Sequence, residues 1–221
     1  MKVCTDACLF GAWAARSILQ HQPSVKTILD IGSGTGLLSL MLAQKMQASI
    51  DAIEINSEAA EQSAENIMSS PWKNICVYNT SIEAFKTGIK YDLVISNPPF
   101  YESSLLSPDE NRNAAMHDSY LTLELLLSSI MKFISSTGYA AILLPISREA
   151  AFTQLLARHK LCILELARVR QSVHHSFFRS MFIVSPEDQT RSNVDDISIH
   201  NSQREYTDEF KELLKDYYLN L

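Results

Sequence analysis

Asp30-Ile31-Gly32-Ser33-Gly34-Thr35-Gly36 separates an apolar run of strand length, 27–31, from a segment with helical periodicity, 37–46. Glycines at a strand-to-helix turn let the backbone approach a ligand closely. In open parallel sheets such a turn lies at the carboxyl ends of the strands, where ligands bind. The heptapeptide therefore predicts a ligand-binding turn at a sheet edge, although a glycine-rich turn alone is a weak signal.

The rest of the chain repeats this alternation of strand and helix. Further short apolar runs have the pattern of buried strands, and they are residues 50–55, 75–78, 92–96 and 139–144. Helical periodicity lies between the runs, in residues 37–46, 58–68, 121–134 and 149–159. Strands that are apolar along their length and joined by helices are typical of parallel sheets covered on both faces. The expected fold class is a doubly wound α/β fold with a mostly parallel sheet.

The last third of the chain has a different pattern. Two β-rich runs, 161–169 and 178–184, have no helix-length segment between them. We therefore expect an antiparallel pair of strands that closes one edge of the sheet. A short strand near 197–199 and an amphipathic helix over 207–218 follow this pair.

The composition is that of one globular domain. The 221 residues are 46% hydrophobic and 20% charged, and the formal net charge is −6. This length suits a single domain over residues 1–221, in which residues 160–221 hold the strand pair and the last helix. The negative total excludes a protein that coats nucleic acid by overall positive charge, but it allows a local basic site.

The sequence gives no indication of a metal site or a membrane segment. The four cysteines form no Cys-x-x-Cys pair, so we expect no metal. No run approaches the roughly 20 apolar residues that cross a bilayer. The apolar stretch 7–15 is too short for a signal peptide. We therefore expect a cytoplasmic protein.

A carboxylate ends the second expected strand. Glu54 stands twenty residues after Gly34, where it can accept hydrogen bonds from both hydroxyls of a ribose. A dinucleotide site requires G-x-G-x-x-G, so that a pyrophosphate can lie on the helix N-terminus. This chain has G-x-G-x-G, with Leu37 in place of the last glycine. The pattern favours S-adenosylmethionine, which carries no phosphate.

The fourth expected strand is followed by Asn97-Pro98-Pro99-Phe100 and then Tyr101. Pro98 forces Asn97 into an extended conformation, and the second proline stiffens the exit from the strand. The exocyclic amine of a purine is a poor nucleophile, because its lone pair is delocalised into the ring. The Asn97 side-chain oxygen and the Pro98 carbonyl can accept its two N–H groups and draw the nitrogen toward sp3 geometry. Phe100 or Tyr101 can stack on the base.

Together the glycine turn, Glu54 and Asn97-Pro98-Pro99-Phe100 resemble class I S-adenosylmethionine-dependent methyltransferases that act on amino groups. More narrowly, the chain is similar to the bacterial valine-tRNA adenine-N6 methyltransferases in residues 1–14, 37–44, 65–66, 70–72 and 206–219. This resemblance implies a Rossmann-like sheet of seven strands, with S-adenosylmethionine as the cofactor. It also implies that the substrate is tRNA, methylated at adenosine 37 beside the anticodon.

The resemblance further implies roles for matching positions. An N-terminal element, residues 1–20, would lie over the cofactor. The cofactor-binding residues would be Lys2, Thr5, Asp6, Asp30, Gly32, Gly34, Gly36, Glu54, Ile55, Ser81, Ile82 and Asn97. The catalytic residues would be Asn97, Pro98, Pro99 and Phe100. Ser81 departs from the family pattern, which usually has an aspartate there to meet the adenine of the cofactor.

Basic residues concentrate in one segment, 145–180. It holds six Lys and Arg against two Glu, a net +4, so the rest of the chain carries −10. We expect the RNA backbone to contact this segment, although an ordinary solvated hairpin explains the sequence equally well. The expected substrate contacts are Tyr101, His117, Arg168, Arg170 and Arg179. His174 and His175 are interpreted as surface residues.

Two other interpretations stay open. Phe100 stands where the family commonly has tyrosine, a change that resembles the guanine-N2 methylases. The first interpretation is therefore another amino-group methylase with the same motif, which acts on rRNA guanine-N2 or on the glutamine-N5 of a release factor. The other interpretation is an RNA-binding module that keeps the fold without catalysis. The acceptor pair of Asn97 and Pro98 argues against it, because a pure binding module has no need of these groups.

Overall fold

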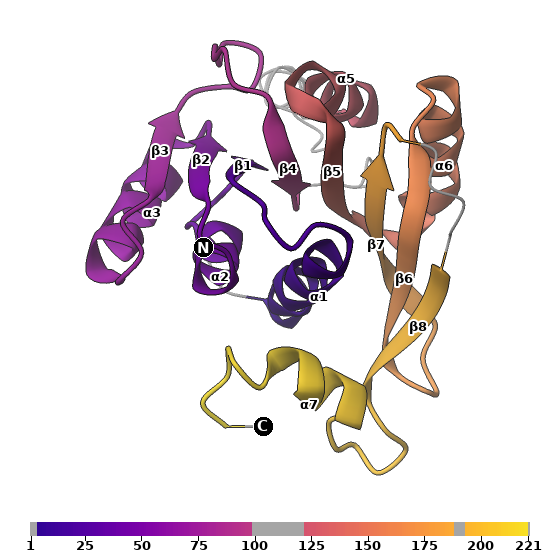
Figure 1. Ribbon diagram of the computed structural model, residues 1–221. Helices are drawn as coiled ribbons and strands as arrows, with labels where there is room; N and C mark the ends of the chain where they lie inside the picture. Colours follow the sequence, from indigo (N-terminus) through magenta and orange to yellow (C-terminus); the bar gives the residue numbers. More distant parts are fainter. Residues whose placement is uncertain (1–3, 99–121, 188–192, 221) are drawn as a thin grey trace, which may run out of the picture.

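The computed structural model describes residues 4–98, 122–187 and 193–220. These residues form one sheet with helices on both faces (Figure 1). The strands are β1 (Thr27–Ile31), β2 (Ser49–Glu54), β3 (Ile75–Asn79), β4 (Tyr91–Ser96), β5 (Ile134–Pro145), β6 (Cys162–Ser172), β7 (Phe177–Ser185) and β8 (Asn193–His200). The α-helices are α1 (Thr5–His21), α2 (Leu37–Lys45), α3 (Ser57–Ser69), α5 (Leu123–Phe133), α6 (Glu149–Arg158) and α7 (Asp208–Leu214).

The strand order is β3-β2-β1-β4-β5-β7-β6-β8. The first five strands in this order are all parallel to their neighbours: β3 to β2, β2 to β1, β1 to β4 and β4 to β5. Strand β7 is antiparallel to both β5 and β6. The doubly wound α/β class and the antiparallel C-terminal pair are therefore confirmed. The chain leaves β1 toward β2 and later returns to its other side as β4, so the order reverses between β1 and β4.

Within the described residues the sheet has eight strands instead of the seven expected. The additional strand is β8, which pairs in parallel with β6 from Asn193 opposite Glu165 to His200 opposite Ser172. The sequence predicted only its buried end, 197–199. The first half of β8 is polar and exposed. Hydrogen bonds to β6, which leave no apolar pattern in the sequence, hold this half in the sheet.

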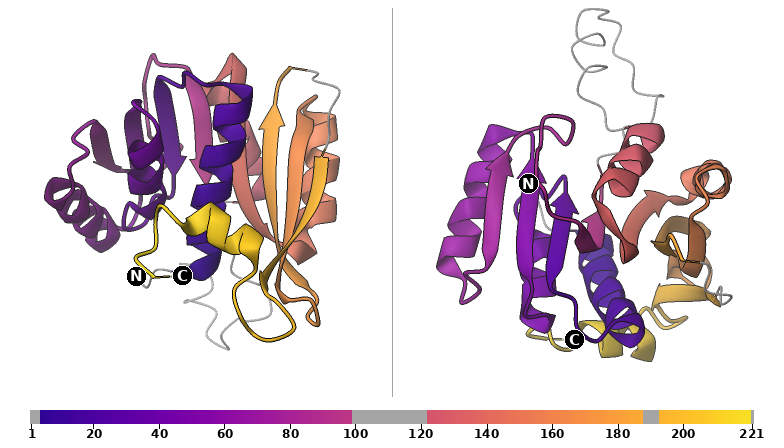
Figure 2. Two further views of the ribbon diagram at one scale, coloured as in Figure 1. Left: turned by 60° about the horizontal axis from the view of Figure 1, so that its bottom comes forward. Right: turned by 45° about the horizontal axis from the view of Figure 1, so that its top comes forward.

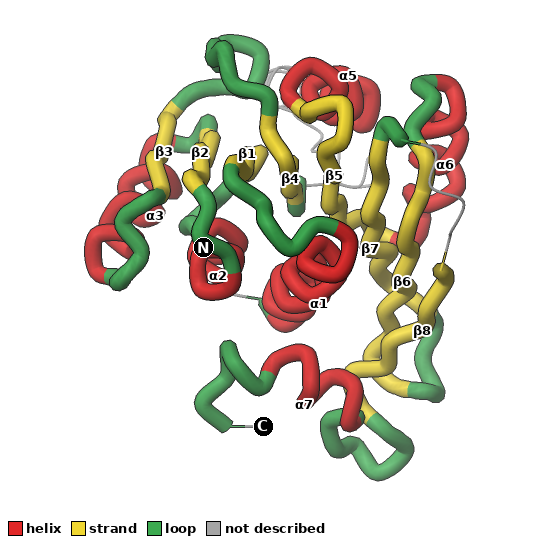
Figure 3. The backbone as a smooth tube through the Cα atoms, in the orientation of Figure 1, coloured by secondary structure: helices red, strands yellow, loops and turns green. Residues whose placement is uncertain are grey.

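Two apolar clusters fill the space between the sheet and its helices. Figures 2 and 3 show helices on both sides of the strands. Helix α1 contributes Phe10 and Trp13 to the cluster on one face, α2 contributes Leu42 and α7 contributes Phe210. Helices α5 and α6 contribute Phe133 and Phe152 to the cluster on the other. In the described part of the chain, no helix is both long and apolar enough to cross a membrane.

Polar side chains cap the N-termini of three helices. The apolar pattern alone does not define where these helices begin. Asn56, Thr122 and Thr207 cap α3, α5 and α7, and each side chain accepts a backbone N–H three residues later. Such caps satisfy N–H groups that have no partner inside the helix. At the other end, α7 stops at Leu214, four residues before the predicted end.

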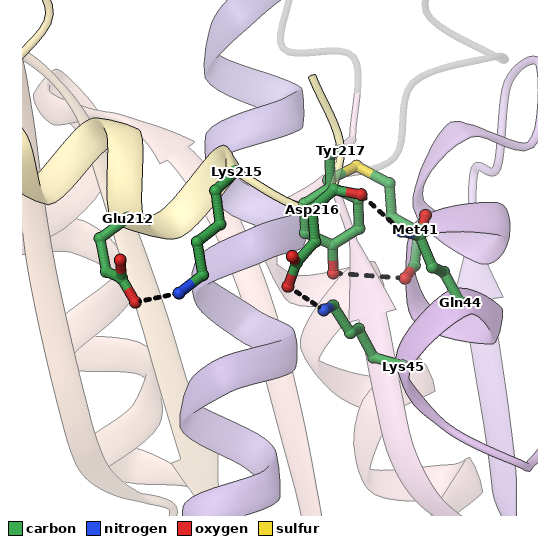
Figure 4. Close-up of polar contacts among 7 residues, drawn as sticks. All are labelled: Met41, Gln44, Lys45, Glu212, Lys215, Asp216 and Tyr217. Carbon is green, nitrogen blue, oxygen red and sulfur yellow. Dashed lines mark hydrogen bonds and ion pairs between the residues drawn. The ribbon is translucent and has the colours of Figure 1, made fainter. Parts of the chain in front are cut away.

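The C-terminal tail after α7 packs against the start of the fold. Figure 4 shows Asp216 paired with Lys45 of α2, and Tyr217 Oη donating to the Met41 carbonyl at 3.4 Å. Tyr217 packs on the cluster that contains α1 and α2. Tyr218 lies within hydrogen-bond reach of Cys8 in α1. The tail thus fastens α1 and α2, and α2 begins directly after the glycine turn.

Replacing Tyr217 by alanine should lower the free energy of unfolding by roughly 2–3 kcal/mol, because the aromatic ring fills part of the core. The corresponding fall in Tm is about 5–10 °C. Tyr217→Phe should cost less than about 1 kcal/mol, since it removes only a long hydrogen bond. Thermal unfolding followed by circular dichroism measures both. Leu219→Ala is the control, because Leu219 is 99% exposed; equal Tm values for Tyr217→Ala and wild type would contradict the role of the tail.

Candidate active site

The glycine turn and the Asn97 motif meet at the centre of the sheet. Ile31 of β1 pairs with Ser96 of β4 at the carboxyl ends of these neighbouring strands. Ser96 Oγ donates a hydrogen bond to the Ile31 carbonyl at 2.8 Å. Gly32 and Asn97 are the next residues along the two strands. The reversal of strand order therefore places both motifs at one crevice, where open α/β sheets bind ligands.

The turn has a backbone conformation that favours glycine. Gly32, Gly34 and Gly36 have φ values of 72°, 56° and 82°. A Cβ on Gly36 would lie 2.6 Å from Ser63 Oγ in α3, whereas a Cβ on Gly32 would meet nothing within 4 Å. At Gly36 the turn is packed against a helix, and at Gly32 it borders open space that a ligand can fill.

Glu54 is buried beside the turn at the end of β2, with 8% of its surface exposed. Its Oε2 accepts the Gly34 N–H at 2.8 Å, and its Oε1 accepts the Asn56 N–H at 2.8 Å. Asn66 of α3 donates to the Thr35 carbonyl at 3.0 Å. These hydrogen bonds hold the carboxylate and the turn in a fixed relation.

Asp30 is the most deeply buried carboxylate near the crevice, with 0% of its surface exposed. Ser39 Oγ donates to its Oδ2 at 2.7 Å. No hydrogen-bond partner for Oδ1 lies among the described residues. Burial raises the pKa of Asp30 to about 7, and the hydrogen bond from Ser39 opposes this shift. An unpaired buried carboxylate oxygen costs stability, so this atom is suited to a cationic ligand group.

The other expected cofactor residues surround the same end of the sheet. Ile55 follows Glu54 and is 59% exposed. Ser81 Oγ accepts the Ala84 N–H at 3.2 Å in the turn after β3, and Ile82 is buried in the core. The contact of Ser81 with the cofactor's adenine stays a prediction, as do the cofactor roles of Ile55 and Ile82.

The N-terminal helix is tied to β7 at its first turn. Asp6 Oδ2 accepts a hydrogen bond from Arg179 Nε at 2.8 Å, and both side chains are half-buried. Thr5 is exposed at the start of α1. The expected covering of the cofactor by this element stays a prediction.

Asn97 and Pro98 are the described part of the motif expected to be catalytic. Asn97 is half-buried and Pro98 is buried. Five expected site residues lie outside the described residues, and these are Lys2, Pro99, Phe100, Tyr101 and His117.

The three arginines expected to contact RNA all have partners within the protein. Arg168 makes a bidentate pair with Glu149, in which Nη2 donates to Oε1 at 2.7 Å and Nε donates to Oε2 at 3.1 Å. Arg179 pairs with Asp6, as described above. Arg170 Nε donates to Ser198 Oγ at 2.8 Å, and its guanidinium lies over the Phe177 ring. Their contact with RNA stays a prediction, but two of the three charges are offset by carboxylates from other elements.

Three contacts of the site were missed by sequence reasoning. Ser39 bonds Asp30 from α2, Asn66 holds the turn from α3, and Ser96 joins β4 to β1. Ser39 lies in a helix whose apolar pattern gave no reason to single it out. Asn66 was indicated only by the resemblance to the methyltransferase family. Within the described ranges, no group of three or more His, Cys, Asp or Glu could hold a metal ion.

Comparison with known proteins points to methyl transfer. Residues 10–114 match the family model of the methyltransferase small domain. The chain is 37% identical over 227 residues to the tRNA1(Val) (adenine(37)-N6)-methyltransferase of Christiangramia forsetii, which covers 100% of this chain and 92% of that protein. A protein of the same name from Shewanella baltica is 34% identical and covers 99% of this chain and 92% of its own length. The chain belongs to this methyltransferase family.

Solved structures of methyltransferases share the fold of this family member. An S-adenosylmethionine-dependent methyltransferase from Clostridium acetobutylicum aligns with a TM-score of 0.61 at 12% identity, over 83% of this chain and 92% of that one. A ribosomal protein L11 methylase from Lactobacillus delbrueckii aligns with a TM-score of 0.59 at 16% identity, over 80% and 76%. At these identities the likeness shows the class I methyltransferase fold.

Asp30→Asn should stabilise this methyltransferase in a pH-dependent manner. The pKa of Asp30 rises from 3.8 to about 7 on folding, so the wild type loses stability as the pH rises across that window. Asparagine has no charge to bury. The Tm advantage of Asp30→Asn should therefore grow between pH 4 and pH 8 by roughly 8–15 °C. Glu61→Gln, which removes an exposed carboxylate, is the control; a pH-independent advantage would contradict the burial of an ionised Asp30.

Arg168→Gln should lower stability by about 1–3 kcal/mol, because it leaves the half-buried Glu149 without its main partner. The double variant Arg168→Gln/Glu149→Gln should be less destabilised than Arg168→Gln alone. The hydrogen bonds from Arg168 lower the pKa of Glu149 below 4.5. The difference between wild type and Arg168→Gln should therefore be present above pH 4.5 and shrink below it. Urea unfolding at pH 4 and pH 7 measures it, and simple additivity of the two substitutions would contradict the pair.

Proposed function

We propose that this protein transfers the methyl group of S-adenosylmethionine to the exocyclic N6 of an adenine in tRNA. The observation that carries the proposal is the pairing of Ile31 with Ser96, which sets Asn97-Pro98 beside the glycine turn. The names of the relatives supply the position, adenosine 37 of a valine tRNA. Such a substrate agrees with the expected cytoplasmic location.

The residues of the crevice fit S-adenosylmethionine. The unpaired Oδ1 of Asp30 offers a buried acceptor to its ammonium group. The carboxylate of Glu54 is suited to the two ribose hydroxyls, and the open space at Gly32 to the methionine part. When bound, this cofactor supplies the reaction's electrophile, a methyl group on a sulfonium.

The chain's own contribution to catalysis is the pair of acceptors at the end of β4. The Asn97 side-chain oxygen and the Pro98 carbonyl can each accept one N–H of the target amine. These hydrogen bonds hold the amine in place and withdraw its lone pair from the ring. They strengthen as positive charge develops on the nitrogen, which stabilises the transition state. Phe100 is expected to stack on the base. Positioning and electrostatics then provide most of the rate.

Asn97→Ala should reduce the rate of methyl transfer by about 100-fold or more, the effect of removing one preorganised hydrogen-bond partner. Its affinity for S-adenosylmethionine should change only a few-fold if the amide acts mainly on the base. The measurement uses labelled cofactor, unmodified valine tRNA and mass spectrometry of the released nucleosides.

A transcript with guanosine at position 37 is the matched control and should accept no label. The proposal is supported if the wild type forms N6-methyladenosine in unmodified valine tRNA and none in the transcript with guanosine at position 37. Label in N2-methylguanosine, or full activity of Asn97→Ala, would contradict it.

A further inference from the structure

A cavity lined by residues with polar side chains lies on the C-terminal side of the sheet, away from the crevice. It has a volume of about 550 Å³. Its walls come from the turn between β6 and β7 and from the loop after β8. The lining includes Gln171, His174, His175, His200, Asn201 and Arg204. In Figure 1 both segments extend below β6 and β8.

These segments lie at the same edge of the sheet as the candidate active site. Ser96 of β4 is in register with Leu166 of β6 through β5 and β7, and the cavity lies six residues further along β6, at Ser172. With about 3.3 Å per residue and 4.8 Å per strand, the cavity is roughly 20–25 Å from Asn97. A stacked nucleic-acid strand covers that distance in about six or seven nucleotides at roughly 3.4 Å per step.

The hydrogen-bond donors of the cavity differ in their partners from the three arginines of β6 and β7. No ion pair of Arg204, His174 or His175 with a carboxylate occurs in the described part of the chain. Glu205, in the same loop, accepts a hydrogen bond at its Oε2 from Asn201 Nδ2 at 3.3 Å. Arg204 therefore offers its donors to a ligand, and each histidine ring has at least one N–H donor in any protonation state.

Hydrogen bonds and ring stacking also hold the loop after β8, which forms one wall of the cavity. Asn201 Oδ1 accepts the N–H groups of Gln203 and Glu205 at 2.9 and 3.0 Å, and this turn holds Arg204 at a φ of 68°. The His200 ring stacks on Tyr206 at 4.9 Å.

Tyr206 in turn stacks on Phe210 at 4.6 Å. This aromatic stack runs from the core to the cavity and ends at His200. On the other wall, Ser172 Oγ bonds His175 Nδ1 at 2.8 Å. Flat rings that end such a stack, next to cationic donors, are suited to a nucleotide.

We propose that this cavity binds one nucleotide of the RNA substrate outside the target base. Arg204 and His174 contact its phosphate, and the His200 ring stacks on its base. The inference rests on the proposed tRNA methylation and adds to it a second contact that holds the RNA across the C-terminal side of the sheet. It assigns the RNA contact to this cavity in preference to Arg168 and Arg179, which carboxylates already engage.

The test measures binding of unmodified valine tRNA to the full-length protein by fluorescence anisotropy at salt concentrations from about 50 to 200 mM. Arg204→Gln should weaken binding about tenfold and reduce the slope of log K against log salt by about 0.9, the loss of one phosphate contact. Glutamine and arginine are equally strained at the positive φ of this position, so the substitution does not change the backbone strain. His200→Ser should weaken binding about fivefold or more through lost stacking. Both variants should bind S-adenosylmethionine as the wild type does.

Arg158→Gln is the matched control, because Arg158 is an exposed arginine on α6, outside the cavity. Equal tRNA affinity for Arg204→Gln and Arg158→Gln would overturn the proposal. If Arg204→Gln weakens the binding of polyglutamate as much as the binding of tRNA, the cavity binds polyanions in general. This result would also overturn the proposal. N6-methyladenosine formation by the wild type is measured on the same tRNA. A wild type that methylates tRNA, with an Arg204→Gln variant that binds it normally, overturns the cavity alone and leaves the proposed function intact.

Discussion

The candidate active site depends on the pairing of β1 with β4. Strands far apart in the sequence end side by side, and Ser96 Oγ bonds the Ile31 carbonyl at the last paired residues. This contact sets the distance between the glycine turn and Asn97. Because the strand order reverses there, neither neighbouring crossover closes the space above the strand ends. The glycine turn and Asn97-Pro98 therefore lie at one crevice without any further rearrangement of the chain.

The crevice contains charge that the fold stabilises only in part. Glu54 has backbone N–H partners for both oxygens, whereas Asp30 has one oxygen bonded to Ser39 and one without a partner among the described residues. Burying a carboxylate in this way costs stability, and a ligand that supplies a positive group offsets the cost. A binding site that is destabilised when empty is a common trade between stability and function.

Charge also shows why a count along the chain is a poor guide to a binding surface. The segment 145–180 has a net charge of +4, yet Arg168 meets Glu149 at a separation of 19 residues and Arg179 meets Asp6 at a separation of 173. The cavity beside the β6–β7 turn includes His200 and Arg204, which lie outside that segment. A surface that holds RNA is defined by which cations lack carboxylate partners in space, and only the folded chain shows this.

The sequence by itself determined the class of fold, most of the strands and helices, and the glycine turn at the end of β1. Periodicity and glycine preference record burial and backbone conformation, which are local properties. It determined neither the polar half of β8 nor the end of α7, where pairing with β6 and packing of the tail outweigh local pattern. Tertiary structure alone decided that Ser39 bonds Asp30, that Asn66 holds the turn and that two of the expected RNA-binding arginines are paired. These contacts join residues whose proximity follows from the order of strands, and a linear pattern carries no information on that order.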